Sequence, residues 1–411
     1  MKQKQFLILI VAAVVLVALG LFIRRGSDKS WSPKSEVEAK VLADFDVTAV
    51  AKIEVTGEEG TVVIAYKDKQ WRVEQKHGYP AKFDTLRDFL MKLRDLKAAQ
   101  TPRVGEKFYG KLGLLEPGKG TSEECATLVN FYDEKGAKLL TLFLGKEHKK
   151  KSQDNGAMGG MMGMMGGGGG SFPDGRYIRV GKTGKVVLVS ETFGSVKNDP
   201  TQWLDKEFFK ISDVKEATLS EAGKGLWKVR RETKSDSLEL VGAIPEDKEV
   251  DTGKLGSIKS AFGWASFTDV ADPNAKPEET GLDTPRTYKA VEFGGTAYTI
   301  RVGKKNTGGK YFMTVSAAYE GATEREAVKD EKPEDKTKND MEFAEKLREK
   351  QEKIEGINAR TSAWVYLVNA YTVENVLKKR GELLKDKPKP EPEKKDDDKP
   401  KDGNKAPELK K

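Results

Sequence analysis

The feature that most constrains the fold of this chain is an internal repeat, because one order of landmark residues occurs twice. The first copy contains, in order, Trp71-Arg72-Val73, Phe83-Asp84, Gly113-Leu114, Leu144-Gly145-Lys146, Tyr177 and Val186-Val187-Leu188-Val189. The second copy contains, in the same order, Trp227-Lys228-Val229, Val250-Asp251, Gly281-Leu282, Val302-Gly303-Lys304, Tyr311 and Trp364-Val365-Tyr366-Leu367-Val368. The doubled order predicts two copies of one structural unit, with Trp71 equivalent to Trp227 and Gly113 to Gly281.

The spacing of the landmarks supports the repeat. Gly113 follows Asp84 by 29 residues, and Gly281 follows Asp251 by 30 residues. The copies differ mainly by two insertions that have too few apolar residues to build a core. These are a Gly/Met-rich loop at 156–170 and a charged insertion at 320–356, whose later half (MEFAEKLREKQEKI) has the pattern of a solvated helix. Surface loops accept insertions cheaply, so residues 45–210 form the first predicted repeat and residues 211–385 the second.

Each predicted repeat has the pattern of an antiparallel sheet with a helix on one face. Apolar residues at 62–66 and 71–73 flank the polar residues 67–70, which is typical of a hairpin. After Asp84, leucines and Phe89 recur at spacings of three and four residues, which predicts an amphipathic helix with Asp84 as its N-cap; Asp251 has the same position in the second copy. Further strands are expected at 128–132, 139–144, 177–180 and 186–189. The predicted class is therefore α+β.

The amino terminus carries the one long apolar run. Residues 6–23 (FLILIVAAVVLVALGLFI) contain no charge and would span about 27 Å as a helix, roughly the thickness of a hydrocarbon core. Residues 1–25 are therefore a predicted transmembrane anchor, with a cleaved signal peptide as the alternative, although the run lacks an A-x-A-like cleavage site. A long domain after such an anchor usually crosses the membrane. The expected location is the bacterial inner membrane, single-pass, with the body extracytoplasmic.

Polar segments border the two repeats, and composition excludes some classes of function. Residues 26–44 form a short predicted stalk, and residues 386–411, rich in Lys, Pro, Glu and Asp, a disordered charged tail. The net charge of +8 over 411 residues, without a basic stripe studded with aromatic residues, argues against nucleic acid as a partner. The single cysteine, Cys125, allows neither an internal disulfide nor a cysteine-based zinc site.

The paired landmarks behind an N-terminal anchor resemble the bacterial family catalogued as domain of unknown function 4340. The residues that carry the resemblance are the two tryptophans, the two Asp-helix starts, Gly-Leu-x-x-Pro ending at Pro117 and Pro285, the two Gly-Lys pairs, and the closing valine-rich strands. The resemblance covers about residues 1–385. It implies a single-pass envelope protein, of a kind often encoded beside gliding-type ABC transporters. It implies no catalytic residue.

Side chains that could carry chemistry are few in this sequence. The only histidines, His77 and His148, lie in polar segments without a neighbouring Ser or Cys motif. The run from Gly175 to Thr183 has five residues between its glycines where a phosphate-binding P-loop has four, and strands on both sides predict a hairpin turn. The Gly-Lys pairs at 145–146 and 303–304 are likewise expected to end strands.

The remaining candidates have structural explanations that we prefer. The acidic pairs Glu123-Glu124 and Asp133-Glu134 stand beside predicted strands with nearby lysines, which favours a solvated face. Trp71 and Trp227 are expected in the cores. Methionines of the 156–170 loop could bind Cu(I) or form an adaptable contact surface. The preferred interpretation, however, is that this loop has no function.

No catalytic, cofactor-binding or metal-binding residue is assigned, and we expect no cofactor and no enzymatic activity. The sequence and the resemblance predict an accessory or scaffold protein with protein partners in an ABC-type transport or motility complex. Two alternatives stay open. One is an extracytoplasmic binding module for glycan, lipid or peptide, which would need an exposed aromatic groove. The other is an enzyme with unfamiliar carboxylate chemistry, which would need two carboxylates of raised pKa in one cleft.

Overall fold

The computed structural model describes residues 40–150, 172–181, 183–326 and 331–388. The predicted anchor 1–25, most of the stalk 26–44, the Gly/Met-rich loop 156–170 and nearly all of the tail 386–411 lie outside these ranges. Among the helices of the described residues, none is both long and apolar enough to cross a membrane. Contacts divide the chain into two compact units, Met1–Glu207 with Thr268–Pro273 and Phe208–Phe267 with Asn274–Lys411.

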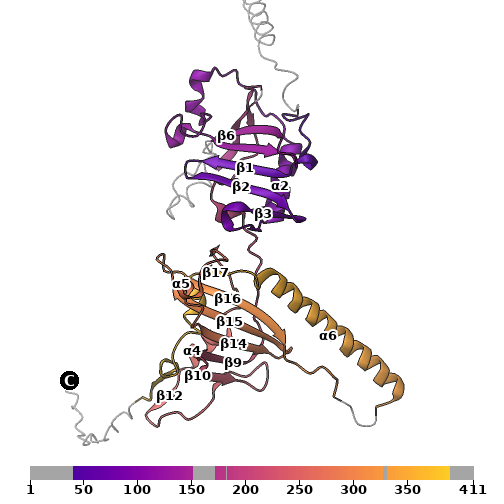
Figure 1. Cartoon of the computed structure of the whole chain (residues 1–411), viewed down its shortest axis with the longest axis vertical. Helices are drawn as coiled ribbons and strands as arrows, with labels where there is room; N and C mark the ends of the chain where they lie inside the picture. The colour runs from indigo at the N-terminus through magenta and orange to yellow at the C-terminus, as the bar shows by residue number, and fades with distance from the viewer. Residues whose placement is uncertain (1–39, 151–171, 182, 327–330, 389–411) are drawn as a thin grey trace, which may run out of the picture. The chain divides into compact units, whose positions relative to one another are not determined.

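The described residues form a mixed α+β protein with two large, mainly antiparallel sheets, which confirms the predicted class (Figure 1). The first sheet has the strand order β4-β3-β2-β1-β5-β6-β7-β8. Its strands are β1 (Lys52–Gly57), β2 (Gly60–Lys67), β3 (Gln70–Val73), β4 (Tyr79–Pro80), β5 (Thr127–Tyr132), β6 (Lys138–Lys150), β7 (Phe172–Val180) and β8 (Val186–Val189). The predicted β2-β3 hairpin is present, and its turn residues Asp68 and Lys69 both have positive φ, as a tight hairpin turn requires.

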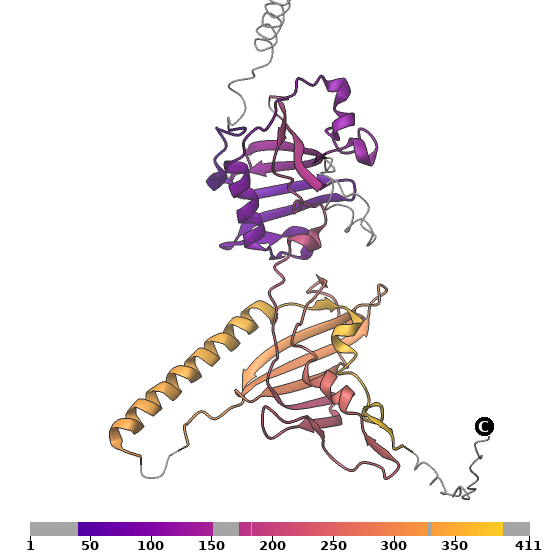
Figure 2. The same ribbon diagram turned by 180° about the vertical axis from the view of Figure 1, so that it is seen from behind.

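Helix α2 (Phe83–Arg94) lies across one face of the first sheet, as the front and back views agree (Figure 2). It buries Leu86, Phe89 and Leu93, the apolar residues at helical spacing, and the Phe89 ring lies 5.8 Å from that of Phe131 on β5. The opposite face of the sheet carries a smaller apolar cluster, which centres on Leu114 and Phe143. Along β1, Ile53 and Val55 face α2 and are buried, whereas Lys52 and Glu54 point to the other face and are only partly buried.

The second sheet has the strand order β11-β10-β9-β14-β15-β16-β17-β13. Its strands are β9 (Val214–Glu221), β10 (Lys224–Arg230), β11 (Glu239–Leu240), β13 (Asp269–Val270), β14 (Arg286–Glu292), β15 (Thr296–Lys305), β16 (Tyr311–Tyr319) and β17 (Tyr366–Val368). A separate ribbon pairs β12 (Lys248–Val250) with β18 (Leu384–Asp386), so the predicted disordered tail begins at least one residue too early. The helices are α4 (Thr252–Lys259), α5 (Pro277–Thr280), α6 (Pro333–Thr361) and α7 (Ala370–Val373).

The two sheets share one pattern of connections. The order β3-β2-β1-β5-β6-β7-β8 in the first corresponds, strand for strand, to β11-β10-β9-β14-β15-β16-β17 in the second. By this correspondence the predicted equivalence of Trp71 and Trp227 is wrong, since Trp71 lies on β3 and Trp227 on β10, the counterpart of β2. A three-residue pattern of alternating polarity is too short to distinguish the two strands of one hairpin.

The expectation that the Gly-Lys pairs end strands holds for Gly303-Lys304, because β15 ends at Lys305, and is wrong for Gly145-Lys146, which lies inside β6. Both pairs lie at a β-bulge, where the register shifts between Leu144 and Glu147 in β6 and between Val302 and Lys305 in β15. A bulge re-aims the backbone and brings it close to another segment, so glycine is required there.

The segment that packs against each bulge is the Gly-Leu landmark of the same unit. Gly113 (φ 64°) and Gly281 (φ 72°) both end short helices in the left-handed conformation. A Cβ atom on Gly113 would lie 3.2 Å from the backbone nitrogen of Lys146, and one on Gly281 would lie 2.7 Å from that of Lys304. The same pair of landmarks therefore makes the same close contact in both units.

Of the two predicted N-cap residues, Asp251 is confirmed and Asp84 is not. Asp251 is the N-cap of α4, and its carboxylate accepts a hydrogen bond from the Lys254 backbone nitrogen at 3.1 Å. Asp84 is not a cap, because α2 begins one residue earlier and has Lys82 at its N-cap position. Asp84 instead pairs with Arg87 at 3.1 Å in the first turn, where a negative charge complements the helix dipole.

The charged insertion contributes more than the sequence indicated. Helix α6 is longer than the predicted solvated helix, and it extends from the second sheet as a long rod (Figure 1). Its last turns bury Ile354 inside the insertion and Ile357 and Thr361 just after it, so the expectation that this insertion adds nothing to a core is wrong at Ile354. Beyond Met313, β16 has no β17 partner, and there the Asn358 side chain accepts from Ala317 N and donates to Ala317 O, both at 2.8 Å.

Replacing Asn358 by Asp should destabilise the second unit by about 2 kcal/mol, because the new carboxylate oxygen would face the Ala317 carbonyl without a donor between them. The matched control is Gln351→Glu, the same chemical change at an exposed position of α6, which should alter stability by less than about 0.5 kcal/mol. Urea unfolding and hydrogen exchange of the Ala317 amide measure the two effects. Equal stability of the two variants would show that the side chain does not protect the strand edge.

Candidate functional site

The described part of the first unit has an open hollow of about 530 Å³ beside α2. Its walls are the segment 47–51, which contains the 3₁₀ turn η1 (Val47–Ala49), the aromatic residues Tyr66 and Trp71, Leu90 of α2, and the turn 133–135 between β5 and β6. Small-molecule sites generally occupy roughly 300 to 1,000 Å³. This hollow is therefore large enough for a ligand of a few rings.

Two aromatic side chains form the apolar wall of the hollow. Tyr66 on β2 is directly opposite Trp71 on β3, and their ring centroids are 5.6 Å apart at an interplanar angle of 56°. Tyr66 is 46% exposed and Trp71 is half-buried, so the prediction that Trp71 is a core residue is wrong. The same prediction is confirmed for Trp227, which is buried and donates its indole N–H to the Lys378 carbonyl at 2.8 Å.

Short turns hold the polar wall of the hollow in place. Asp46 caps η1 by accepting a hydrogen bond from the Thr48 backbone nitrogen at 2.9 Å. Asp133 accepts hydrogen bonds from the backbone nitrogens of Lys135 at 2.9 Å and Ala137 at 2.8 Å, which fixes the β5-β6 turn. The exposed side chains of Glu134 and Lys135 stand on this turn at the rim.

The other face of the same sheet carries a polar cluster around Glu54. Its carboxylate accepts hydrogen bonds from Lys52 Nζ at 2.9 Å and from Tyr132 Oη at 2.6 Å, and Lys52 also lies over the Tyr132 ring. Burial by itself would raise the pKa of Glu54, but the hydrogen bonds from Tyr132 and Lys52 and the charges of Lys52 and Lys138 outweigh it, so the pKa is lowered. Burial, followed by the hydrogen bond to Glu54, raises the pKa of Tyr132 to about 12.

This cluster predicts a pH dependence of stability. Because the folded-state pKa of Glu54 is lowered, its stabilising contribution is present above the ordinary value of 4.5 and is lost as the pH falls through the folded-state pKa. Glu54→Gln should remove that part of the acid destabilisation, measured by urea unfolding at about pH 7 and about pH 3.5. The exposed Glu59→Gln is the control, and an unchanged pH dependence in Glu54→Gln would contradict the assignment.

The predicted hairpin between Gly175 and Thr183 is confirmed, because β7 and β8 pair directly on either side of this turn. Lys182 lies outside the described residues. The two arginines of the run bind backbone carbonyls: Arg176 Nε donates to Gly145 O in the β6 bulge at 2.7 Å, and Arg179 donates to Leu114 O at 3.2 Å. Arg179 also stacks 3.4 Å from the centroid of the Phe143 ring. These contacts are structural, as the spacing of the glycines indicated.

The structure places the two histidines on separate elements. His77 ends the turn η2 (Glu74–Lys76) in the left-handed conformation, and its Nδ1 lies 3.9 Å from Asp272. His148 lies on β6, and its Nδ1 lies 2.6 Å from Asp174 on β7. Among the described residues, neither ring hydrogen-bonds to a serine or cysteine. Cys125 is unpaired, and its thiol donates to the Glu116 carbonyl at 3.3 Å.

The acidic pairs weighed in the sequence lie at opposite ends of β5. Glu124 completes a capping box with Thr121 in the turn η5 (Ser122–Glu124), whereas Asp133 and Glu134 are in the turn that follows the strand. The structure therefore does not bring the pairs together.

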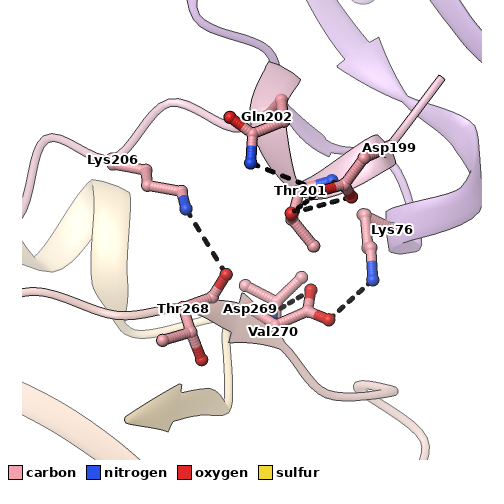
Figure 3. A network of polar contacts seen from close by, with 8 residues as sticks. All are labelled: Lys76, Asp199, Thr201, Gln202, Lys206, Thr268, Asp269 and Val270. Atoms are coloured by element: carbon pink, nitrogen blue, oxygen red, sulfur yellow. Dashed lines mark hydrogen bonds and ion pairs between the residues drawn. The ribbon is translucent and has the colours of Figure 1, made fainter. Parts of the chain in front are cut away.

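A different acidic site appears only in three dimensions, where Lys76 lies between Asp199 and Asp269 (Figure 3). Lys76 Nζ is 2.6 Å from Asp269, and Lys206 Nζ donates to the Thr268 carbonyl at 3.4 Å. Burial opposes ionisation of Asp199, but its hydrogen bonds from Thr201 and Gln202 and the charge of Lys76 lower its pKa. A general acid needs a raised pKa, and this carboxylate instead caps η6 (Pro200–Trp203).

Other carboxylates share the lowered pKa of Asp199, because each accepts hydrogen bonds or lies near lysine or arginine; these groups are Asp46, Glu54, Asp95, Glu116, Asp213, Glu221, Asp236, Asp251 and Glu331. In the part of the chain that the structure describes, no group of three or more His, Cys, Asp or Glu side chains could hold a metal ion. The aromatic hollow is therefore the strongest candidate site. The sequence signal for it was a pair of aromatic residues flanking a hairpin turn.

Comparison with known proteins gives one match. The family model described as "Domain of unknown function (DUF4340)" matches residues 167–285, a stretch that includes β7 and β8 of the first unit and β9, β10 and α4 of the second. No curated protein and no solved structure matches the chain.

Proposed function

We propose that this chain, which belongs to the family of domain of unknown function 4340, is a membrane-anchored accessory or scaffold protein of the bacterial envelope. In this proposal residues 1–25 are a single transmembrane anchor, the body is extracytoplasmic, and the protein partners are subunits of an ABC-type transport or motility complex. The chain performs no catalysis and binds no nucleic acid. Its role is to present docking surfaces beside the transporter.

The observation that carries this proposal is the doubled sheet. The shared strand order and the shared contact between a left-handed glycine and a Gly-Lys bulge support an origin by duplication of one α+β unit. A duplicated module offers two related surfaces to a partner, which suits a protein that works by docking. The lowered pKa values of Glu54 and Asp199 give no support to general acid catalysis by these carboxyl groups.

Affinity capture from detergent-solubilised membranes tests the accessory role. The full chain with a C-terminal tag should co-purify with subunits of an ABC-type transporter. The control protein consists of residues 1–44, the predicted anchor and stalk, followed by the same tag, and it should not co-purify with them. If both baits recover the same proteins, the folded units do not dock on the complex and the proposal fails.

The proposed topology has its own test. In a Cys125→Ser background, a Gly403→Cys variant should react with a membrane-impermeant thiol reagent in intact spheroplasts as well as after lysis. The charged composition around residue 403 favours solvation of the new thiol. Labelling only after lysis would place the body in the cytoplasm and overturn the envelope location.

A second candidate function is an extracytoplasmic binding module for glycan, lipid or peptide. The observation that favours it is the hollow beside Tyr66 and Trp71, since an exposed aromatic groove was the feature this function required. Binding of a soluble ligand by the purified chain, in the absence of any transporter subunit, would separate this function from the accessory role.

A further inference from the structure

We propose that the hollow beside Tyr66 and Trp71 binds a neutral oligosaccharide made of pyranose rings with equatorial substituents, an inference that rests on the binding-module candidate and narrows its ligand to a glycan. The two rings, the polar groups and the net charge at the rim, and the pairing of the strands support this choice of ligand.

The two rings supply apolar surfaces suited to a sugar. Pyranoses with equatorial hydroxyl groups present flat faces of C–H bonds, whose partial positive charge is attracted to the negative face of an aromatic ring. Tyr66 and Trp71 are inclined to each other by 56°, so they do not stack as one closed pair, and both line the hollow. The aromatic wall can therefore contact a sugar ring at an open surface.

The polar groups at the hollow match the hydroxyl groups of a sugar, which both donate and accept hydrogen bonds. The indole N–H of Trp71 and the phenol of Tyr66 have no hydrogen-bond partner among the described residues, and Glu134 and Lys135 likewise have no ion pair there. Tyr66 can donate or accept, Lys135 can only donate and ionised Glu134 can only accept. The hollow thus offers both kinds of hydrogen-bonding group around an aromatic wall.

The rim favours a neutral ligand over an anion. The carboxylates of Asp133 and Glu134 outnumber the ammonium group of Lys135, so the rim has a net charge of −1 and repels an anionic ligand. Asp133 is further committed to the turn by its two backbone hydrogen bonds. Charges of both signs on the rim also disfavour an acyl chain, whose burial requires an apolar lining.

Strand pairing argues against an extended peptide. Peptides that add to a sheet require a free strand edge. The aromatic residues are on β2 and β3. Strand β2 pairs with β1 and β3, and strand β3 pairs with β2 and β4. Their backbone groups are therefore not available as a template for a peptide strand.

Fluorine NMR of the full chain labelled with 5-fluorotryptophan tests the proposal at the site itself. The chain contains 6 tryptophans, and the Trp71→Phe variant assigns the signal of Trp71. The protein is kept in a detergent without a sugar headgroup, because a maltoside would compete. Cellotetraose and the β-linked tetrasaccharide of N-acetylglucosamine should shift the Trp71 signal, while the signal of Trp264, a 91% exposed tryptophan of the second unit, stays in place.

Calorimetric titration of the same sugars gives the energetic test. Trp71→Ala should weaken binding by about tenfold, as loss of a central aromatic contact generally does, and Tyr66→Ala should weaken it by roughly fivefold. Trp264→Ala is the matched control and should leave the affinity unchanged. Trp71→Phe retains a ring and should recover part of the loss, so a folding defect in Trp71→Ala would not hide the result.

The other ligand classes are tested in parallel with tetra-alanine and with vesicles of phosphatidylethanolamine and phosphatidylglycerol. If either of these moves the Trp71 signal and the sugars do not, the glycan inference is overturned while the binding module stands. If no probe moves the signal, the hollow is not a glycan site and the binding-module candidate loses its support. The accessory role is judged independently by the capture experiment.

Discussion

Replacing Gly303 by alanine should destabilise the second unit by about 3 kcal/mol, because the new methyl group would overlap backbone atoms that cannot rotate away. Gly303 lies in the bulge of β15, and a Cβ atom there would be 2.1 Å from the Thr280 carbonyl oxygen and 3.1 Å from the Gly281 carbonyl carbon. Relief would require the bulge and the end of α5 to move apart. That movement would break the packing of the Gly-Leu landmark on the strand.

The matched control is Gly256→Ala in the middle of α4, where a Cβ atom would meet nothing within 4 Å. Alanine is favoured over glycine in helices, so this variant should be more stable by about 0.5 to 1 kcal/mol. Urea unfolding followed by circular dichroism compares the two. If Gly303→Ala is as stable as the parent chain, the close approach at the bulge is not a constraint on the fold.

The counterpart in the first unit extends the prediction. A Cβ atom on Gly145 would lie 2.5 Å from the Leu112 carbonyl oxygen, so Gly145→Ala should destabilise the first unit for the same reason. A loss of similar size at both positions is expected if one contact recurs in both units. A loss at Gly303 alone would mean that the two bulges differ in how tightly they are packed.

The sequence predicted local structure well where the local pattern alone determines it. The hairpin at 62–73 and the helix that begins near residue 84 follow from alternation and from helical spacing, and both are present. Strand β8 has the predicted bounds, because a short run of four valine and leucine residues between turns leaves little freedom of register.

Predictions that needed three-dimensional contacts were less accurate. The pair Gly145-Lys146 is not a strand end but part of a bulge inside β6, and the sequence does not reveal the Gly-Leu segment that packs on this bulge. Helix α6 was expected to be solvated because its composition is charged, but two isoleucines one turn apart are enough to anchor its end to β16. Asp84 was assigned as a cap from residue type, and residue type does not determine the residue at which a helix begins.

The candidate site could not be predicted, because its walls come from four separate stretches of the first unit. Residues 47–51, the β2-β3 hairpin, Leu90 and the turn at 133–135 meet only after β1 and β5 have paired. The sequence showed Trp71 as one of two similar tryptophans, and burial distinguishes them: Trp227 packs in its core, whereas Trp71 stands at an opening.

The largest expected effect concerns membrane attachment, on which the proposed location depends. Replacing both Val14 and Val15 by arginine should release the protein from the membrane fraction, because each charge at the centre of a spanning helix costs about 2.5 to 3.5 kcal/mol on the insertion scale. The control adds the same two charges just outside the apolar run, as Ser30→Arg with Ser32→Arg, and should remain with the membranes. Carbonate-washed membranes probed for the tagged chain measure both variants. Retention of the Val14 and Val15 variant would show that attachment depends on something other than residues 6–23, such as a partner in the membrane. The predicted anchor would then be wrong. The proposed docking role would not be affected.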